Sequence, residues 1–395
     1  MASLGCPPTR LQFHPSFPPC PCSVLFIPFS LPSLPPSSPL AAAKALSLNS
    51  TFFPPTSAPS APPPCPLHLK LAWILDQFGV LHDGKKAYPQ AIEALRQLAA
   101  SGAKVVLLSN SSRRVEVASK RLPSLGFDPS LFCGIETSGE ITHRHLIDRS
   151  LDTFFQTLGS KCLHFTWAAR GAVSLEGLGL QVVETPEEAD FILAHGTEAV
   201  GVAEADKPAR PASLDELAGL MSRAAEEGRR RGRMIPMVVA NPDIVTVEAR
   251  ALRVMPGTLA REYEAMGGVV KCMGKPDSIS FRAAQQLTGI SLDRTVMVGD
   301  SLHHDILGAA SFGIDSVFVA GGIHADQLGV PPPPATAAVG NGEEEGRRVR
   351  KSENGGKGRG KVEGEAKGGV DVGKLRVLVE ETGAEPSYVL PYFQW

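Results

Sequence analysis

The feature that most constrains the fold is a series of short apolar runs that alternate with amphipathic stretches from Leu69 onward. Parallel strands joined by helices produce this alternation, because such strands are buried on both faces whereas each helix buries only one. The sequence therefore predicts an α/β fold with a mostly parallel sheet. The runs expected to form buried strands are LAWIL (71–75), KVVLLS (104–109), VVKCM (269–273), TVMVGD (295–300) and SVFVA (316–320).

Two of the intervening stretches carry apolar residues at helical spacing. QAIEALRQLAASG (90–102) and SISFRAAQQLTG (278–289) both end in glycine, a common residue just after the last turn of a helix. We expect each of them to form a helix that covers the sheet.

A second set of candidate elements interrupts this series between Cys133 and about Met255. KCLHFT, LQVVET, DFILAH and MIPMVVAN are typical of strands, and DELAGLMSRAAEEGRRRG of an amphipathic helix. This stretch is long enough for a small α/β domain inserted into the first. The basic cluster 229–233 could form a nucleic-acid patch, but its place at a helix end beside Glu226 and Glu227 favours a solvated helix terminus.

The two low-complexity regions hold most of the 34 prolines and many of the 39 glycines. Residues 1–66 contain no Asp or Glu and are rich in Ser and Pro, so we expect a disordered leader. It is typical of a transit peptide for a plastid or mitochondrion, with a cytoplasmic protein as the alternative. Residues 331–369 are expected to be a disordered insertion. The division is 69–137 for the first part of the core, 138–255 for the inserted domain, 256–330 for the second part of the core, and 370–395 for an apolar C-terminal segment that docks on the core.

Charge and cysteine content limit the partners. The net charge of −2 gives no reason to expect nucleic acid or a membrane surface, which leaves a small polar ligand. Cys133, Cys162 and Cys272 are scattered singly, which fits neither a disulfide framework nor a zinc site and indicates a reducing compartment. No oligomeric state is predicted.

Polar residues follow four of the predicted core strands. Asp76, Ser109 with Asn110, Lys275 and Asp300 each come at or just after the end of an apolar run. Each one alone could be a turn residue or a helix cap. Ligands of open α/β sheets bind at the carboxyl ends of the strands, so together these residues predict one site, with Asp305 one helical turn beyond Asp300.

In this order, the segments DQFGVLHDG, LLSNSSRR, GKPDSI and VGDSLHHDI resemble the four motifs of the haloacid dehalogenase (HAD) superfamily. The inserted domain between the second and third motifs, with GVLHDG and ANPD (240–243), is similar to the type IIA branch. AGGIH (320–324) and the terminal PSYVLPYFQW resemble a little-characterised subgroup of it. The resemblance implies a Rossmann-like core with a smaller α/β cap.

The resemblance also implies an activity, that of a Mg²⁺-dependent phosphatase acting on a small phosphorylated metabolite. Asp76 would be the nucleophile that forms an aspartyl-phosphate. Ser109, Asn110 and Lys275 would hold the phosphate oxygens.

Other residues would bind the metal and the rest of the substrate. Mg²⁺ would be bound by Asp76, Asp300 and the backbone carbonyl of Phe78, with Asp305 behind them fixing waters or Lys275. From the cap, Asn241 and Asp243 would contact the substrate, unless Asn-Pro-Asp is simply a turn. His303 and His304 are expected at the surface.

The sequence departs from the resemblance at Phe78, where HAD phosphatases usually carry a second Asp that protonates the leaving oxygen and then activates water. Three hypotheses follow. The first is a phosphatase that is slow, uses an activated leaving group or recruits another acid such as Asp83. The second is hydrolysis of a carbon–halogen bond, because haloacid dehalogenases carry an aromatic residue here. The third is a non-catalytic protein that binds a phosphorylated metabolite.

Overall fold

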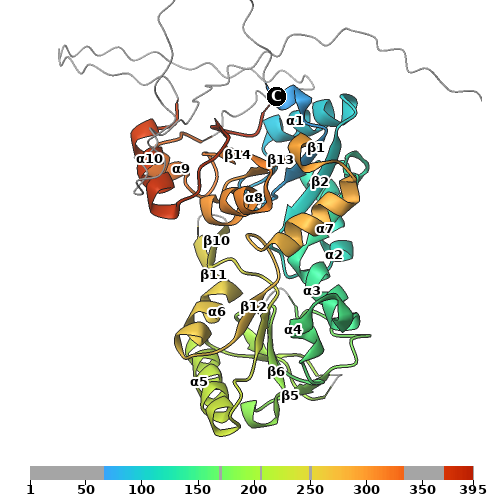
Figure 1. The fold of residues 1–395 in the computed structure, drawn as a ribbon, viewed down its shortest axis with the longest axis vertical. Helices are drawn as coiled ribbons and strands as arrows, with labels where there is room; N and C mark the ends of the chain where they lie inside the picture. The colour runs from blue at the N-terminus through green and yellow to red at the C-terminus, as the bar shows by residue number, and fades with distance from the viewer. Residues whose placement is uncertain (1–65, 169–170, 205–206, 249–250, 333–368, 395) are drawn as a thin grey trace, which may run out of the picture.

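A computed structural model describes residues 66–168, 171–204, 207–248, 251–332 and 369–394 (Figure 1). The predicted leader and the predicted insertion 331–369 lie almost entirely outside these residues. Among the residues described, no helix has both the length and the apolar character needed to span a membrane.

The upper half of the molecule in Figure 1 is built on a six-stranded sheet with the order β15-β14-β13-β1-β2-β3. All five pairings are parallel, as predicted from the unbroken apolar runs. The strands are β1 (Ala72–Leu75), β2 (Lys104–Ser109), β3 (Gly134–Thr137), β13 (Thr295–Gly299), β14 (Asp315–Val319) and β15 (Tyr388–Leu390).

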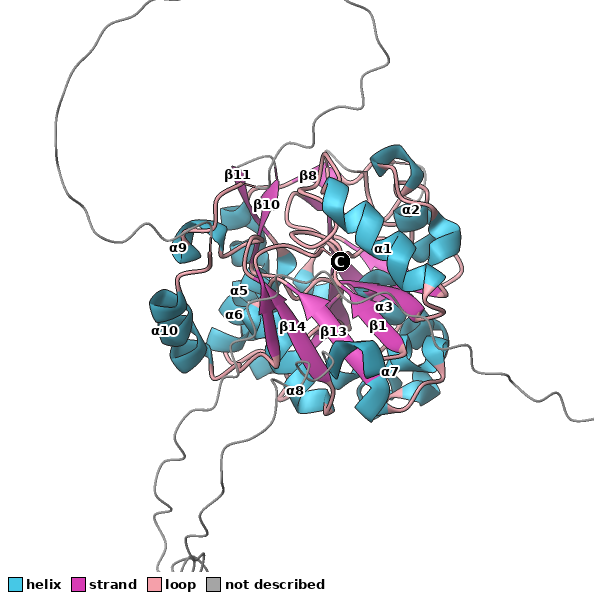
Figure 2. Cartoon of the chain, turned by 90° about the horizontal axis from the view of Figure 1, so that it is seen from above, coloured by secondary structure: helices cyan, strands magenta, loops and turns pink. Residues whose placement is uncertain are grey.

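Helices cover both faces of this sheet (Figure 2). Alternate residues of β1 point to opposite faces: Trp73 and Leu75 pack with α1 (Pro89–Ala100), whereas Ile74 packs with α7 (Ser278–Thr288) and α8 (Leu307–Phe312). Leu95 and other core residues are fully buried, which contributes about 1.5–3 kcal/mol for each large aliphatic side chain. The shorter helices of this half are α2 (Val115–Ser119) and α9 (Ala325–Leu328), whereas α3 (Ser138–Ile147) and α4 (Thr153–Gln156) pack with strands of the cap.

The lower half of the molecule is the inserted cap, built on a second sheet in which β12-β9-β6-β4-β7-β8 are neighbours and β5 pairs with β4. Helices α5 (Leu214–Arg230) and α6 (Pro256–Ala265) cover it and share its hydrophobic core. The strands are β4 (Lys161–Thr166), β5 (Gln181–Val183), β6 (Phe191–Ala194), β7 (Ala199–Val200), β8 (Arg210–Pro211), β9 (Met237–Val239) and β12 (Val270–Cys272).

The sheet assignment of VVKCM was wrong. Its strand β12 pairs in parallel with β9 of the cap sheet, not with the core sheet. Helix α6 also belongs to the cap, because Leu259 and Tyr263 are buried in the cap core. The cap therefore extends through β12, past the predicted boundary at 255, and the chain returns to the core near Lys275.

The segment after ANPD (240–243), for which no strand was predicted, contains one. β10 (Val245–Glu248) and β11 (Ala251–Val254) form an antiparallel hairpin between the two halves of the molecule. In the basic cluster, Arg230 and Arg231 pair with Glu227 at 2.5 and 2.6 Å, in line with the interpretation as a helix terminus.

The C-terminal segment lies on the core. Helix α10 (Val372–Thr382) packs near α9, and β15 adds the edge strand beside β14. Tyr392 and Phe393 are buried. This segment therefore completes the sheet edge next to β14.

Candidate active site

The predicted site residues lie around one cavity of about 100 Å³ between the core and the cap. Asp76 and Ser109 come from the ends of β1 and β2, and Asp300 follows β13, as expected for neighbouring parallel strands. The cap contributes Trp167 and the segment from Asn241 to Thr246. The predicted residues that line this cavity are Asp76, Phe78, Ser109, Asn110, Asn241, Asp243, Lys275, Asp300 and Asp305.

A buried ion network joins three of these residues. The Lys275 ammonium contacts the carboxylate of Asp76 and lies 2.7 Å from Asp305 Oδ1. Burial raises the pKa of Asp76 to about 7, although the positive charge of Lys275 opposes the shift. Burial alone would lower the pKa of Lys275, but Asp305 and Asp76 raise it above its usual value, so the ammonium stays charged.

The carboxylate of Asp300 sits in a cradle of backbone. The Ile323 N–H donates to Asp300 Oδ2 at 2.8 Å. A Cβ atom at Gly79 or at Gly322 would lie 1.7 or 2.1 Å from the same oxygen, so only glycine fits at these two positions. Burial, together with the negative charges of Asp76 and Asp305, raises the pKa of Asp300 well above its usual range.

Asn110 does not have the contacts expected of a phosphate ligand. Its Oδ1 accepts from the Lys275 N–H at 2.8 Å, and its Nδ2 donates to the Lys275 carbonyl at 3.0 Å and to Asp243 Oδ1 at 2.8 Å. The amide therefore holds the Lys275 backbone and joins core and cap, and the role of Asn110 in substrate binding stays a prediction.

The cap residues Asn241 and Asp243 form a turn and also lie at the cavity, so both interpretations of Asn-Pro-Asp stay compatible with the structure. Asn241 Oδ1 accepts from the Asp243 N–H at 2.9 Å, which is the side-chain-to-backbone bond of a turn. Both residues also line the cavity. His304 was expected at the surface, but it lines the same cavity, with Nδ1 3.5 Å from Asp243 Oδ1 and 3.2 Å from Ser301 Oγ.

Comparisons with known proteins identify the family. Residues 73–171 match the model of haloacid dehalogenase-like hydrolases, and residues 272–341 match a HAD-hydrolase-like model. The two matched segments flank most of the cap and contain the strand ends that carry Asp76, Ser109, Lys275 and Asp300. The chain belongs to the HAD superfamily.

Three relatives are similar over most of their own length. The 5'-nucleotidase YutF of Bacillus subtilis (strain 168) is 25% identical over 256 residues, which are 64% of this chain and 87% of the relative. Glycerol-3-phosphate phosphatase of Homo sapiens is 28% identical over 262 residues, or 63% of this chain and 78% of the relative. A haloacid dehalogenase-like hydrolase structure from Brucella suis 1330 superposes with a TM-score of 0.53 at 26% identity and covers 66% of this chain and 89% of that one.

The place of the cap assigns this HAD hydrolase to the type IIA branch. The cap is inserted between the strand end that carries Ser109 and the loop that carries Lys275. The cap therefore lies over the strand ends that carry Asp76, Ser109 and Asp300.

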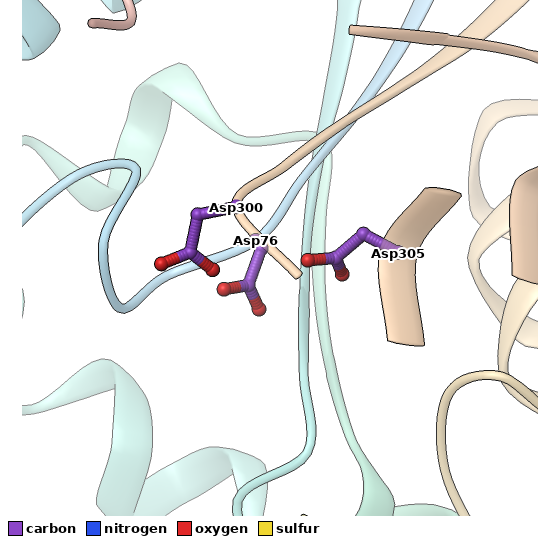
Figure 3. A group of neighbouring side chains, drawn as sticks. All are labelled: Asp76, Asp300 and Asp305. Atoms are coloured by element: carbon purple, nitrogen blue, oxygen red, sulfur yellow. The ribbon is translucent and has the colours of Figure 1, made fainter. Parts of the chain in front are cut away.

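The three carboxylates fit a hard divalent cation. Asp76, Asp300 and Asp305 each offer an oxygen within 4.8 Å of the others, and Figure 3 shows Asp76 between the other two. Lys275 supplies only one positive charge against three carboxylates. The pKa values of Asp76 and Asp300 are raised mainly by burial and further by the negative charges around them. Oxygen ligands of this kind suit Mg²⁺.

The contacts of Asp305 suggest a different role from those of Asp76 and Asp300. Its Oδ1 pairs with Lys275, and its Oδ2 accepts from the Ser301 N–H at 3.0 Å. Oδ2 thus has a hydrogen bond and Oδ1 an ion-pair contact without a hydrogen bond, which fits the expected position behind the direct ligands. Asp76 and Asp300 are left as the side chains that would bind the cation.

Asp83 does not replace the missing acid. Its Oδ1 accepts from the N–H groups of Lys85 and Lys86 at 2.8 and 2.7 Å, and the side chain is exposed and away from the cavity. Asp83 therefore has the structural turn role that the His-Asp-Gly sequence also allowed.

Sequence reasoning missed several groups at the site. AGGIH (320–324) was interpreted only as a subgroup signature. Its paired glycines also indicate that the backbone approaches another group closely, and this signal could have placed them beside Asp300. Trp167 and Arg113 also line the cavity. Nothing local in the sequence identifies Trp167, because its position depends on how the cap packs over the core.

Proposed function

We propose that this protein is a Mg²⁺-dependent phosphatase that acts on a small phosphorylated metabolite through an aspartyl-phosphate on Asp76. The observation that carries the proposal is the Asp76 carboxylate at the end of β1, paired with Lys275 and beside Asp300 in a largely buried cavity. The relatives from Bacillus subtilis and human, named as a nucleotidase and a phosphatase, support the same reaction class.

Each group has a defined part in this proposal. The carboxylate of Asp76 attacks phosphorus, and the ammonium of Lys275 neutralises charge on the nucleophile and the phosphoryl oxygens. The Ser109 hydroxyl would donate a hydrogen bond to the phosphate. A cation held by Asp76, Asp300 and the Phe78 carbonyl would supply further charge neutralisation when bound.

The experiment is phosphate release by the purified chain from a panel of phosphomonoesters with Mg²⁺. We expect turnover that is lost when Mg²⁺ is chelated. Asp76→Asn should reduce turnover to background, and circular dichroism should show that both proteins are equally folded. Equal rates for wild type and Asp76→Asn on every substrate would reject the proposal.

Hydrolysis of a carbon–halogen bond is the second candidate, and the aromatic side chain of Phe78 is the observation that favours it. The excess of carboxylates around Lys275 favours the phosphatase, because hydrolysis of a carbon–halogen bond does not require a bound cation. Halide release from 2-haloacids without Mg²⁺ would support the second candidate. A ligand-induced thermal shift without any turnover would instead support a binding protein.

A further inference from the structure

The side chain of Phe78 is a fixed wall of the cavity. Its ring lies edge to face with His82, with ring centroids 4.7 Å apart and an interplanar angle of 74°. A Cβ atom at Gly84 would lie only 2.9 Å from Phe78 Cε1, so the turn closes tightly on the ring. The position two residues after the nucleophile is therefore occupied by a packed apolar side chain that has no acidic proton to donate.

The rest of this turn offers no proton donor to the cavity either. Asp83 is exposed and bonded to its own turn. His82 is fully buried, and its Nδ1 accepts from the Gly84 N–H at 2.9 Å. Its ring is held within the turn and does not line the cavity. Within residues 76–88, all of which the structure describes, Asp76 is the only acidic side chain that lines the cavity.

The part of the cavity outside the carboxylates has several apolar residues. Trp167, Val245 and Met255 line it from the cap, and Ile323 and Phe78 from the core. Trp167 is held in place by a hydrogen bond from its indole N–H to Ser112 Oγ at 3.1 Å. These surfaces suit an apolar or aromatic organic group better than a polyol.

We propose that the preferred substrates are phosphate esters of phenols or similarly acidic hydroxyls, whose leaving groups depart without protonation. This inference rests on the proposed phosphatase function. In the first step a bond forms between an Asp76 oxygen and phosphorus while the ester P–O bond breaks. The aryl oxygen keeps the electron pair and leaves as its anion.

In the second step, water attacks phosphorus and the bond from phosphorus to Asp76 breaks. This step returns the carboxylate and releases inorganic phosphate and one proton. An alkyl ester would need the leaving oxygen to be protonated in the first step, and general acid help of that kind is typically worth about 10²–10⁴ in rate.

The test measures kcat/KM of the full chain with Mg²⁺ for a series of substituted phenyl phosphates and for glycerol phosphate. We expect the rate to fall steeply as the leaving-group pKa rises, with glycerol phosphate slower than p-nitrophenyl phosphate by about 10²-fold or more. Phe78→Asp should flatten this dependence, whereas the matched control Phe78→Leu should preserve it. If Phe78→Asp fails to fold, the wild-type series still decides.

Other outcomes would overturn the inference. One is a comparable rate for alkyl and aryl esters in the wild type. Another is a selective loss of alkyl-ester hydrolysis in Asp83→Asn or His304→Gln, because that residue would then supply the proton. Absence of phosphate release from every ester would reject the phosphatase itself, which is a different result.

Discussion

At the scale of single residues, the position of Asp300 depends on two glycines that leave room for its carboxylate. We predict that Gly322→Ala lowers kcat/KM by about 10²-fold, because displacement of a catalytic group by about 1 Å can have that effect. The new Cβ would lie 2.1 Å from Asp300 Oδ2, so the carboxylate or the loop must move. Steady-state kinetics with a Mg²⁺ titration measures the loss.

The control for this prediction is Gly219→Ala on α5. Gly219 is exposed within the helix and a Cβ there meets nothing within 4 Å. Alanine favours the helix by roughly 0.5–1 kcal/mol, so this variant should be fully active with an unchanged or higher melting temperature. Full activity of Gly322→Ala would contradict the close packing around Asp300.

Asn110 allows a second prediction at this scale, because its amide joins Lys275 to the cap. Asn110→Asp cannot donate to the Lys275 carbonyl and places a carboxylate beside Asp243. We expect lower kcat and a loss of about 1–3 kcal/mol in the free energy of unfolding. Chemical denaturation and kinetics measure the two effects. A higher KM of Asn110→Asp with unchanged stability would instead support the substrate-binding role of Asn110 that the sequence predicts.

The chemical types at the site could be predicted from the sequence, but many of their contacts could not. Asp76, Ser109 and Asp300 come directly at strand ends, and the parallel sheet brings such positions together. The use of the Asn110 amide depends on Asp243, which is 133 residues away in the chain. A local pattern carries no information on that pairing.

At the scale of elements, the edge strand β15 supports the loop that holds Asp300. The N–H groups of Ala320 and Gly321 donate to the carbonyls of Leu390 and Pro391, each at 2.8 Å. The ring of Tyr392 covers Gly321, where a Cβ would lie 2.4 Å from Cε1. β15 therefore fixes the backbone that leads to Ile323, the donor to Asp300.

We predict that Tyr392→Ala weakens Mg²⁺ activation and also lowers the melting temperature, because the covering ring is lost. Loss of a buried aromatic side chain typically costs about 3–5 kcal/mol. The Mg²⁺ concentration for half-maximal activity and thermal unfolding are the measurements, with Tyr392→Phe as the control that keeps the ring. Normal Mg²⁺ activation in Tyr392→Ala would show that the loop does not need this support.

Elements were predictable where the apolar pattern alone decides them, as in β2 and α7. Strand β12 was placed in the wrong sheet because VVKCM has the same apolar pattern in either sheet, and its partner β9 is distant in sequence. Strand β10 was missed although Val245 and Val247 alternate with polar residues, because the Asn-Pro-Asp turn dominated the interpretation of that stretch.

At the scale of the whole molecule, core and cap meet across the cavity through Asp243. This cap residue accepts from Asn110 of the core and lies near His304, which follows β13 of the core. The cavity of about 100 Å³ is smaller than most ligand pockets, so we expect the cap to move when a substrate enters. The contact between Asn110 and Asp243 therefore favours the closed arrangement.

We predict that Asp243→Ala shifts the protein toward open arrangements. Loss of a hydrogen bond worth about 0.5–1.5 kcal/mol should raise KM by up to about tenfold, with a smaller change in kcat. Hydrogen exchange should become faster in residues 109–113 and 241–246, which face each other across the cavity. Asp326→Ala, at an exposed position of α9, is the control. Unchanged exchange together with a lower kcat would mean that Asp243 acts on the reacting groups, so that the cap would contribute to the chemistry as well as to closure.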